Sequence, residues 1–149
     1  MLTNVKILLS RGMTMPAYAT SGSAAVDMRA AIDEDAPVTI APGARAMIPT
    51  GMAISLENAN VVAILAARSG LAIKQGICLS NGIGVIDSDY RGEICVGLHN
   101  TSRVPFTVNR GDRIAQMMFM PVLAAKLIEA ASLDETARGA GGFGSTGVK

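Results

Sequence analysis

The chain has 149 residues, a length that suits a single domain with a sizeable buried core. Its 13 basic and 12 acidic residues give a formal charge of +1, so the composition does not indicate a nucleic-acid surface. Half the residues are apolar, yet there is no Trp and only three Phe and two Tyr. We therefore expect a core of aliphatic side chains and Met.

The same composition argues against a membrane segment and a structural metal. No apolar run approaches the ~18 residues of a membrane span, and the N-terminal run is too short for a secretory signal. Cys78 and Cys95 are isolated, and a single His cannot complete a zinc site with them. We expect a cytoplasmic protein with two buried free thiols.

Short apolar runs alternate with turn residues along the chain and predict many short strands. The predicted strands are 5–9, 25–30, 38–40, 46–48, 52–56, 61–66, 77–79, 93–99, 106–108, 113–121 and 125–129. A spacing of roughly 8–12 residues between strands favours an all-β barrel or sandwich. The run 61–66 is apolar throughout, which is typical of a strand buried on both faces and suggests an oligomer.

One short helix is predicted near the middle of the chain. Ser69 is a good N-cap, residues 71–75 can form one or two turns, and Gly76 can end them. Arg68 precedes this start. An arginine beside free helix amides could bind phosphate, although an ordinary capped helix with a surface arginine explains the same residues.

The stretch 84–93 predicts a strand, a turn and a second strand. Asp87 lies at the mouth of this predicted hairpin, where its carboxylate could orient a water molecule, and Tyr90 could lie against a ring of a ligand. Asp89 could be a nearby structural acid. A solvated turn, in which Asp is common, remains the alternative.

The last residues differ from the rest because 139–147 contain five glycines and cannot form a core face. They match G-x-G-x-x-G formally, but no helix can follow Gly144, so a dinucleotide fold is not indicated. We expect a flexible tail whose amides could wrap phosphates and whose Phe143 could stack on a ligand. A disordered end is the alternative.

Five segments, in a fixed order, resemble the five motifs of the trimeric dUTPase family. They are 24–30, 67–72, 81–93, 110–116 and 138–147. The departures are small: the family commonly has Pro at the position of Ala67, often His at that of Gln75, and usually Leu at that of Met28.

This resemblance implies a fold and an assembly. It implies an all-β, jelly-roll-like subunit with one short helix, which forms a homotrimer with active sites at subunit contacts. Residues 1–137 would form the β domain, and residues 138–149 would be the tail that closes over a site. dUTP would be the ligand, with no membrane and no direct nucleic-acid partner.

The resemblance also implies a reaction, the hydrolysis of dUTP to dUMP and pyrophosphate. This would limit uracil in DNA and supply dUMP for thymidylate synthesis. Asp87 would activate a water that attacks the α-phosphorus. Mg²⁺ would be held mainly by the substrate phosphates, with Asp27 reaching it through water. The phosphates would be bound by Arg68, Ser69, Gly70 and Gln116, and covered by Arg138, Gly144 and Ser145.

Recognition of the base and sugar follows from the same resemblance. Uracil would pair with the hairpin backbone near Val85, Ile86 and Cys95 and with the Asn81 side chain, which disfavours cytosine. Tyr90 would pack on the deoxyribose and exclude a 2′-hydroxyl, and Phe143 would stack on uracil.

Two other functions are compatible with parts of this pattern. dCTP deaminase shares the fold, but we expect a Glu in its catalytic hairpin where this chain has Asp87. A dUTPase-like protein can also have an additional regulatory role through protein partners, and the sequence does not exclude one.

Overall fold

The computed structural model describes residues 3–142 of the chain. These residues form eleven strands and one short helix. In chain order they are β1 (Val5–Leu9), β2 (Val26–Arg29), β3 (Val38–Ile40), β4 (Arg45–Pro49), β5 (Met52–Leu56), β6 (Val61–Ala66), α1 (Ser69–Gln75), β7 (Ile77–Leu79), β8 (Gly84–Ile86), β9 (Cys95–Asn100), β10 (Phe106–Val108) and β11 (Arg113–Pro121). The described chain is therefore all-β with one helix, as the sequence predicts.

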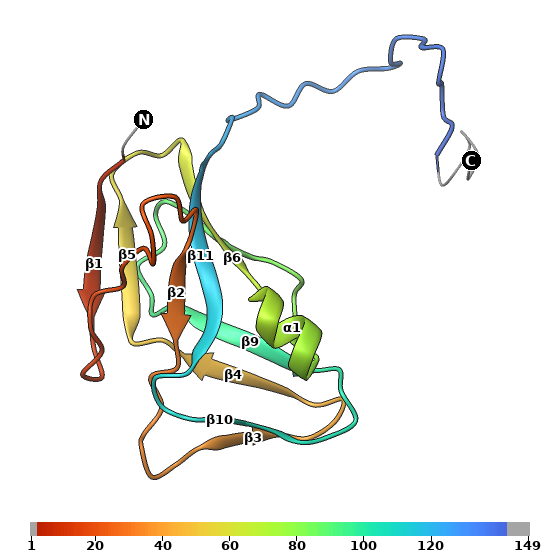
Figure 1. The fold of residues 1–149 in the computed structure, drawn as a ribbon. Coiled ribbons are helices and arrows are strands. Elements are labelled where there is room, and N and C mark those ends of the chain that lie inside the picture. The colour runs from red at the N-terminus through yellow and green to blue at the C-terminus, as the bar shows by residue number, and fades with distance from the viewer. Residues whose placement is uncertain (1–2, 143–149) are drawn as a thin grey trace.

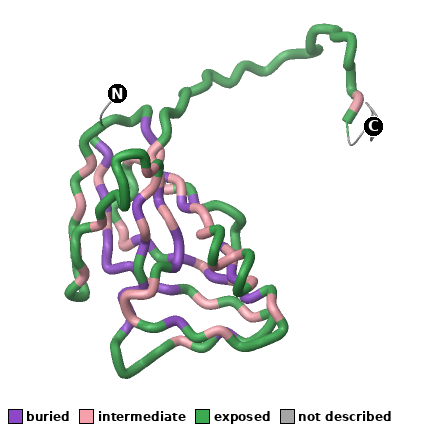
Figure 2. Tube along the Cα trace, in the orientation of Figure 1, coloured by how far each residue is buried: buried purple, intermediate pink, exposed green. Residues whose placement is uncertain are grey.

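The strands form four small antiparallel sheets around one core (Figure 1). The largest has the strand order β2-β11-β6-β8, and the second has the order β4-β9-β7. β1 pairs with β5, and β3 pairs with β10. The buried residues in Figure 2 follow the strands, and most of the core is aliphatic or Met, as the shortage of aromatic residues predicts.

Strand β6 is fully buried on only one face in the described chain. Val61, Ala63 and Leu65 are buried, whereas the alternate residues are half-buried. β11 and β8 lie on either side of β6 and form hydrogen bonds with its backbone, but the face with the alternate residues is only partly covered. The single chain therefore does not fully bury both faces of β6, and burial of the second face against another subunit stays a prediction.

The helix begins one residue earlier than a Ser69 cap would place it. Arg68 occupies the N-cap position, no side chain caps the helix, and Ser69 is its first helical residue. The predicted end is confirmed. Gly76 has φ of 68°, and an added Cβ would lie 2.9 Å from the Ser102 side chain. Glycine is thus required there both by the left-handed backbone and by space.

Strands β8 and β9 do not form the predicted hairpin. β8 pairs with β6, whereas β9 pairs with β4 and β7 in another sheet. Ile94, just before β9, is instead bonded to the start of β5 and to the turn that precedes it. Its N–H donates to the Met52 carbonyl at 2.8 Å, and Thr50 Oγ1 donates to the Ile94 carbonyl at 2.6 Å. The two strands are therefore splayed apart.

The predicted strand 125–129 is absent from the described chain. After β11 ends at Pro121, residues 122–142 contain no strand and extend away from the sheets (Figure 1). Leu123 and Leu127 are more than 90% exposed. An apolar run does not form a strand without a neighbouring strand, and the single chain offers none here.

No helix among residues 3–142 is long and apolar enough to cross a membrane.

Candidate functional site

One cleft brings together most residues predicted to bind phosphate. It has a volume of about 520 Å³ and lies beside the start of α1. We call it the arginine cleft, and its polar and glycine lining residues are Ser23, Asp27, Arg68, Ser69, Gly70, Arg113 and Gln116. Residues of the first, second and fourth motifs thus meet in one place, as expected.

The strand register explains why these side chains converge. Gln116 of β11 lies opposite Asp27 of β2 on one side and opposite Ala66 of β6 on the other. The Gln116 amide donates to the carbonyl of Ala67 at 2.9 Å, just after β6 ends. The next residue, Arg68, is thereby directed toward Asp27, and its Nε lies 2.8 Å from Oδ1.

Arg113 is a cleft residue that the sequence reasoning missed. Its Nη1 lies 3.2 Å from Oδ2 of Asp27. Residues 113 and 116 should point to opposite faces of a regular strand, but the register shifts between Arg113 and Ala115. This bulge turns both side chains toward the cleft. The bulge could have been predicted only from the pairing of β11 with β2, which the sequence does not reveal.

The charges of the arginine cleft suit an anion. Two guanidinium groups share one carboxylate, so the three charged groups that line the cleft carry a net positive charge. Arg68 and Asp27 are both about one-quarter exposed, so an entering ligand can reach them. The cleft can exchange part of this internal ion pair for charge-assisted bonds to a phosphate.

A second, smaller hollow lies between the splayed strands. We call it the β8–β9 pocket; its volume is about 100 Å³. It is lined by Leu65, Leu79, Asn81, Gly84, Val85, Ile86, Cys95, Val96 and Gly97. The four residues predicted to pair with uracil, namely Asn81, Val85, Ile86 and Cys95, therefore line one pocket. Cys95 is exposed and Cys78 is half-buried, so the prediction of two buried thiols is wrong. Partial desolvation still raises the pKa of the Cys95 thiol, so the thiol is neutral near pH 7.

The turn after β8 carries the predicted base. Asp87 is exposed, and its carbonyl accepts a bond from Tyr90 N–H at 3.2 Å. The Arg91 guanidinium donates to the carbonyls of Ser88 and Tyr90, which closes the turn. Neither Asp87 nor Tyr90 lines the arginine cleft or the β8–β9 pocket.

The two hollows thus have no lining residue in common, and Asp87 and Tyr90 lie outside both. Arg138 lies apart from both, and its Nε donates to the Gly141 carbonyl at 2.8 Å. The other predicted tail residues, Phe143, Gly144 and Ser145, lie outside the described residues.

Comparison with known proteins identifies the family. The dUTPase family model matches residues 11–147. A deoxyuridine 5'-triphosphate nucleotidohydrolase of Desulfitobacterium hafniense (strain DSM 10664 / DCB-2) is 57% identical over 134 residues, which cover 90% of this chain and 87% of that protein. The enzyme of the same name from Rhizobium etli (strain CFN 42) is 48% identical and covers 99% of this chain and 94% of its own length.

Solved structures agree with the fold. A mutant dUTPase of phage 80alpha matches with a TM-score of 0.85 at 24% identity, covering 97% of this chain and 99% of that one. The phage 80alpha dUTPase with dUpNHpp gives a TM-score of 0.81, also at 24% identity and with the same coverage. The five ordered motifs, the fold and these relatives lead to one conclusion: the chain belongs to the dUTPase family.

Proposed function

We propose that this chain hydrolyses dUTP to dUMP and pyrophosphate. The observation that carries the proposal is the arginine cleft, where Arg68, Arg113 and Gln116 surround Asp27 in a chain of this family. The relatives from D. hafniense and R. etli carry the name of this activity. A cationic cleft and a separate small pocket suit a ligand with a phosphate chain at one end and a base at the other.

Phosphate binding would use the cleft as it stands. The Arg68 and Arg113 guanidinium groups would turn part of their bonding from Asp27 to the phosphates. Ser69 and Gly70 are exposed at the start of α1, so their backbone amides and the Ser69 hydroxyl can donate to the same oxygens. These contacts would orient the α-phosphorus for attack.

Base recognition would use the β8–β9 pocket. Backbone amides and carbonyls near Val85, Ile86 and Cys95 have fixed donor and acceptor roles, and Asn81 adds a side-chain amide. Cytosine would present the wrong pattern and leave buried groups without partners, which costs about 1–3 kcal/mol for each group. A hollow of about 100 Å³ also leaves little room for the methyl group of thymine.

The chemical step would belong to Asp87. Its exposed carboxylate would accept a proton from a water molecule as that water attacks the α-phosphorus and pyrophosphate leaves. Tyr90, at the other end of the same turn, would pack on the deoxyribose and exclude a 2′-hydroxyl. The two residues would thus set rate and sugar selectivity from one rigid turn.

The residues of the cleft fit a magnesium ion that is held mainly by the substrate. Residues 3–142 contain no cluster of three His, Cys, Asp or Glu residues that could hold a metal by themselves. Asp27 is the carboxylate of the cleft and would reach the ion through water. When bound, Mg²⁺ would neutralise phosphate charge and stabilise the charge on the leaving pyrophosphate.

The complete site would form in a homotrimer. One chain does not bring Asp87 and the arginine cleft into one hollow, which supports sites built from more than one subunit. The tail 138–149 would close over a site, with Arg138 on the phosphates and Phe143 stacked on uracil for roughly 1–3 kcal/mol. In a cytoplasmic setting the reaction would limit uracil in DNA and supply dUMP for thymidylate synthesis.

Product assays test this function. Incubation with dUTP, dCTP, dTTP and UTP, each with and without Mg²⁺, should release pyrophosphate from dUTP alone at a high rate, and much less without the metal. Ammonia release should be absent with dCTP. Ammonia from dCTP without pyrophosphate from dUTP would favour a deaminase instead.

A further inference from the structure

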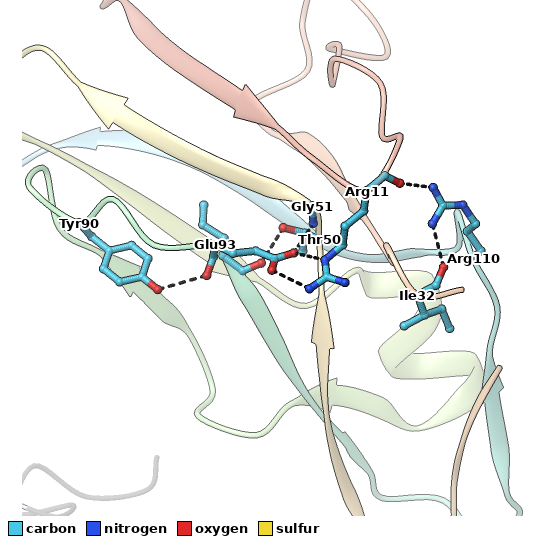
Figure 3. Close-up of polar contacts among 8 residues, drawn as sticks. Arg11, Ile32, Thr50, Gly51, Tyr90, Glu93 and Arg110 are labelled. Carbon is cyan, nitrogen blue, oxygen red and sulfur yellow. Dashed lines mark hydrogen bonds and ion pairs between the residues drawn. The ribbon is translucent and has the colours of Figure 1, made fainter. Parts of the chain in front are cut away.

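Arg11 lines neither hollow, but it is bonded to Glu93, which follows the turn that carries Asp87 and Tyr90 (Figure 3). Arg11 donates from Nε to Oε1 of Glu93 at 2.9 Å and from Nη2 to Oε2 at 3.1 Å, a bidentate pair. Arg110 donates to the Arg11 carbonyl and, at 2.8 Å, to that of Ile32. The Arg11 turn is therefore held in place from the other side.

Glu93 connects this pair to the segment before β5. Its Oε1 also accepts the Gly51 N–H at 2.8 Å. The hydrogen bond from Arg11 lowers the pKa of Glu93, so the carboxylate is ionised at neutral pH and the pair is complete. Both carboxylate oxygens of Glu93 are thus held by charge-assisted hydrogen bonds.

The Tyr90 ring rests on this same residue. Tyr90 Oη donates to the Glu93 carbonyl at 3.1 Å, and Figure 3 shows the ring directed toward it. Glycine at position 92 leaves space for the Tyr90 ring, because an added Cβ there would lie 2.6 Å from Cζ of Tyr90. The ring is otherwise 44% exposed, so its orientation depends on few contacts.

The backbone of Arg11 supports a role for its side chain. Its φ is 53°, and it is the one residue other than glycine with positive φ among residues 3–142. This conformation is strained for an arginine and easy for Gly or Asn. An exposed ion pair contributes little to stability by itself, so stability alone does not explain an arginine here.

We propose that Arg11 is a positioning residue, which acts through Glu93 to fix the Tyr90 ring and thereby sets discrimination between dUTP and UTP. This inference rests on the proposed function, in which the Tyr90 ring packs on the sugar. Arg11 itself lines neither hollow, so it would contact neither the substrate nor the attacking water. The competing view is that the backbone bonds of Ile94 to Thr50 and Met52 fix the turn without help.

Substitutions of Arg11 separate the two views. Arg11→Asn tolerates the left-handed turn but loses the ion pair, so its melting temperature should stay near that of the parent. Its ratio of kcat/KM for dUTP over UTP should fall by roughly fivefold, while kcat for dUTP stays within about twofold. Arg11→Lys, which keeps one charged contact, should give an intermediate ratio.

A matched control removes another exposed ion pair. Glu57, which follows β5, lies 3.2 Å from Lys6 of β1 and does not line the hollow that Lys6 shares with Arg91, so Glu57→Gln should leave the ratio unchanged. Tyr90→Ala should lower the ratio, and adding Arg11→Asn to it should cause no further fall, because the two residues act in series.

A spectroscopic readout does not depend on activity. The chain has no Trp and two Tyr, so in a Tyr18→Phe background the near-ultraviolet circular dichroism of tyrosine reports on Tyr90 alone. Arg11→Asn should reduce this signal as the ring gains freedom.

The outcomes distinguish a failure of the role proposed for Arg11 from a failure of the proposed function. An unchanged dUTP/UTP ratio and an unchanged tyrosine signal in Arg11→Asn, with a lower ratio in Tyr90→Ala, would overturn the role of Arg11 alone. An unchanged ratio in Tyr90→Ala would overturn both the sugar contact and this inference, while dUTP hydrolysis itself would still stand.

Discussion

At the scale of single residues, Asp87 is the residue that we propose as the general base. It is exposed at the end of β8 and lines neither hollow. Asp87→Asn keeps the shape of the side chain and removes the base. Turnover of dUTP should fall by ~10² or more, the usual scale for a lost general base.

Substrate affinity of Asp87→Asn should stay within several-fold of the parent, because the arginine cleft and the β8–β9 pocket are intact. Single-turnover kinetics with dUTP measure both quantities. Asp89→Asn is the matched control, since it removes an exposed carboxylate from the same turn, and its turnover should stay close to that of the parent. Near-normal turnover of Asp87→Asn would assign the base elsewhere.

The Arg11–Glu93 pair also predicts a pH dependence of stability. The bond from Arg11 lowers the folded-state pKa of Glu93. The pair therefore stabilises the fold above the unfolded pKa, about 4.3, and loses this effect as the pH falls through the lower folded value. Because the pair is partly exposed, the difference in melting temperature between Glu93→Gln and the parent should be small at pH 7, and it should shrink further below about pH 4.

Calorimetry across a pH series measures this difference. The Arg11→Met/Glu93→Gln double variant serves as the control, because neither partner can titrate there and its difference from Glu93→Gln should not change with pH in this range. A gap between Glu93→Gln and the parent that is equally large at pH 3 and pH 7 would contradict a stabilising ionised pair.

At the scale of elements, the sequence predicts strands well where turn residues bound an apolar run. Residues 113–121 are predicted and observed as β11 with the same bounds. Burial patterns and turn signals are local, so they can be read directly from such a segment. The side chains that β11 presents to the cleft cannot be predicted in this way, because the bulge near Arg113 depends on pairing with β2.

Other errors have the same origin in non-local pairing. The predicted hairpin around Asp87 is wrong because the residues before β9 bond to Thr50 and Met52, which are distant in sequence. Arg11 and Glu93 were missed as a pair for the same reason, since no local pattern connects them. The resemblance to the family motifs, in contrast, named several residues that line each hollow without any knowledge of strand pairing, although it missed Arg113.

Strand β8 is positioned by a glycine, which gives a prediction at this scale. A Cβ at Gly84 would lie 2.9 Å from Leu65 Cβ, and both residues line the β8–β9 pocket. Gly84→Ala should push β8 away from β6, destabilise the fold by about 1–3 kcal/mol and raise KM for dUTP more than it lowers kcat. Denaturant unfolding and steady-state kinetics measure these effects.

Gly22→Ala is the control for Gly84→Ala, because an added Cβ at Gly22 meets nothing within 4 Å. It should leave both stability and KM unchanged. A Gly84→Ala protein with parental KM would mean that the spacing of β8 and β6 does not shape the pocket.

At the scale of the whole molecule, the arrangement of the described chain favours sites shared between subunits. The arginine cleft and the turn with Asp87 lie on different parts of one subunit and share no hollow. The segment after β11 extends away from its own sheets and exposes Leu123, Leu127 and Leu133 almost fully. A large exposed apolar content is typical of a surface that another subunit covers.

The tail provides the prediction that tests this arrangement. Each backbone residue that becomes ordered loses roughly 1–2 kcal/mol of conformational freedom, so a glycine-rich tail should close only when a ligand offers contacts. A chain that ends at Ala137 keeps every described strand and should still form a trimer with a melting temperature near that of the parent. Its turnover of dUTP should fall sharply, because the site stays open to water.

Mixing two inactive chains then identifies which subunit supplies which part. The truncated chain retains Asp87, and the full-length Asp87→Asn chain retains the tail. After subunit exchange, mixed trimers would contain sites with a carboxylate from one chain and a tail from another, so part of the activity should return. Exchange is verified by native mass spectrometry, and each variant alone is the control. Confirmed mixed trimers without any recovered activity would show that base and tail come from the same subunit.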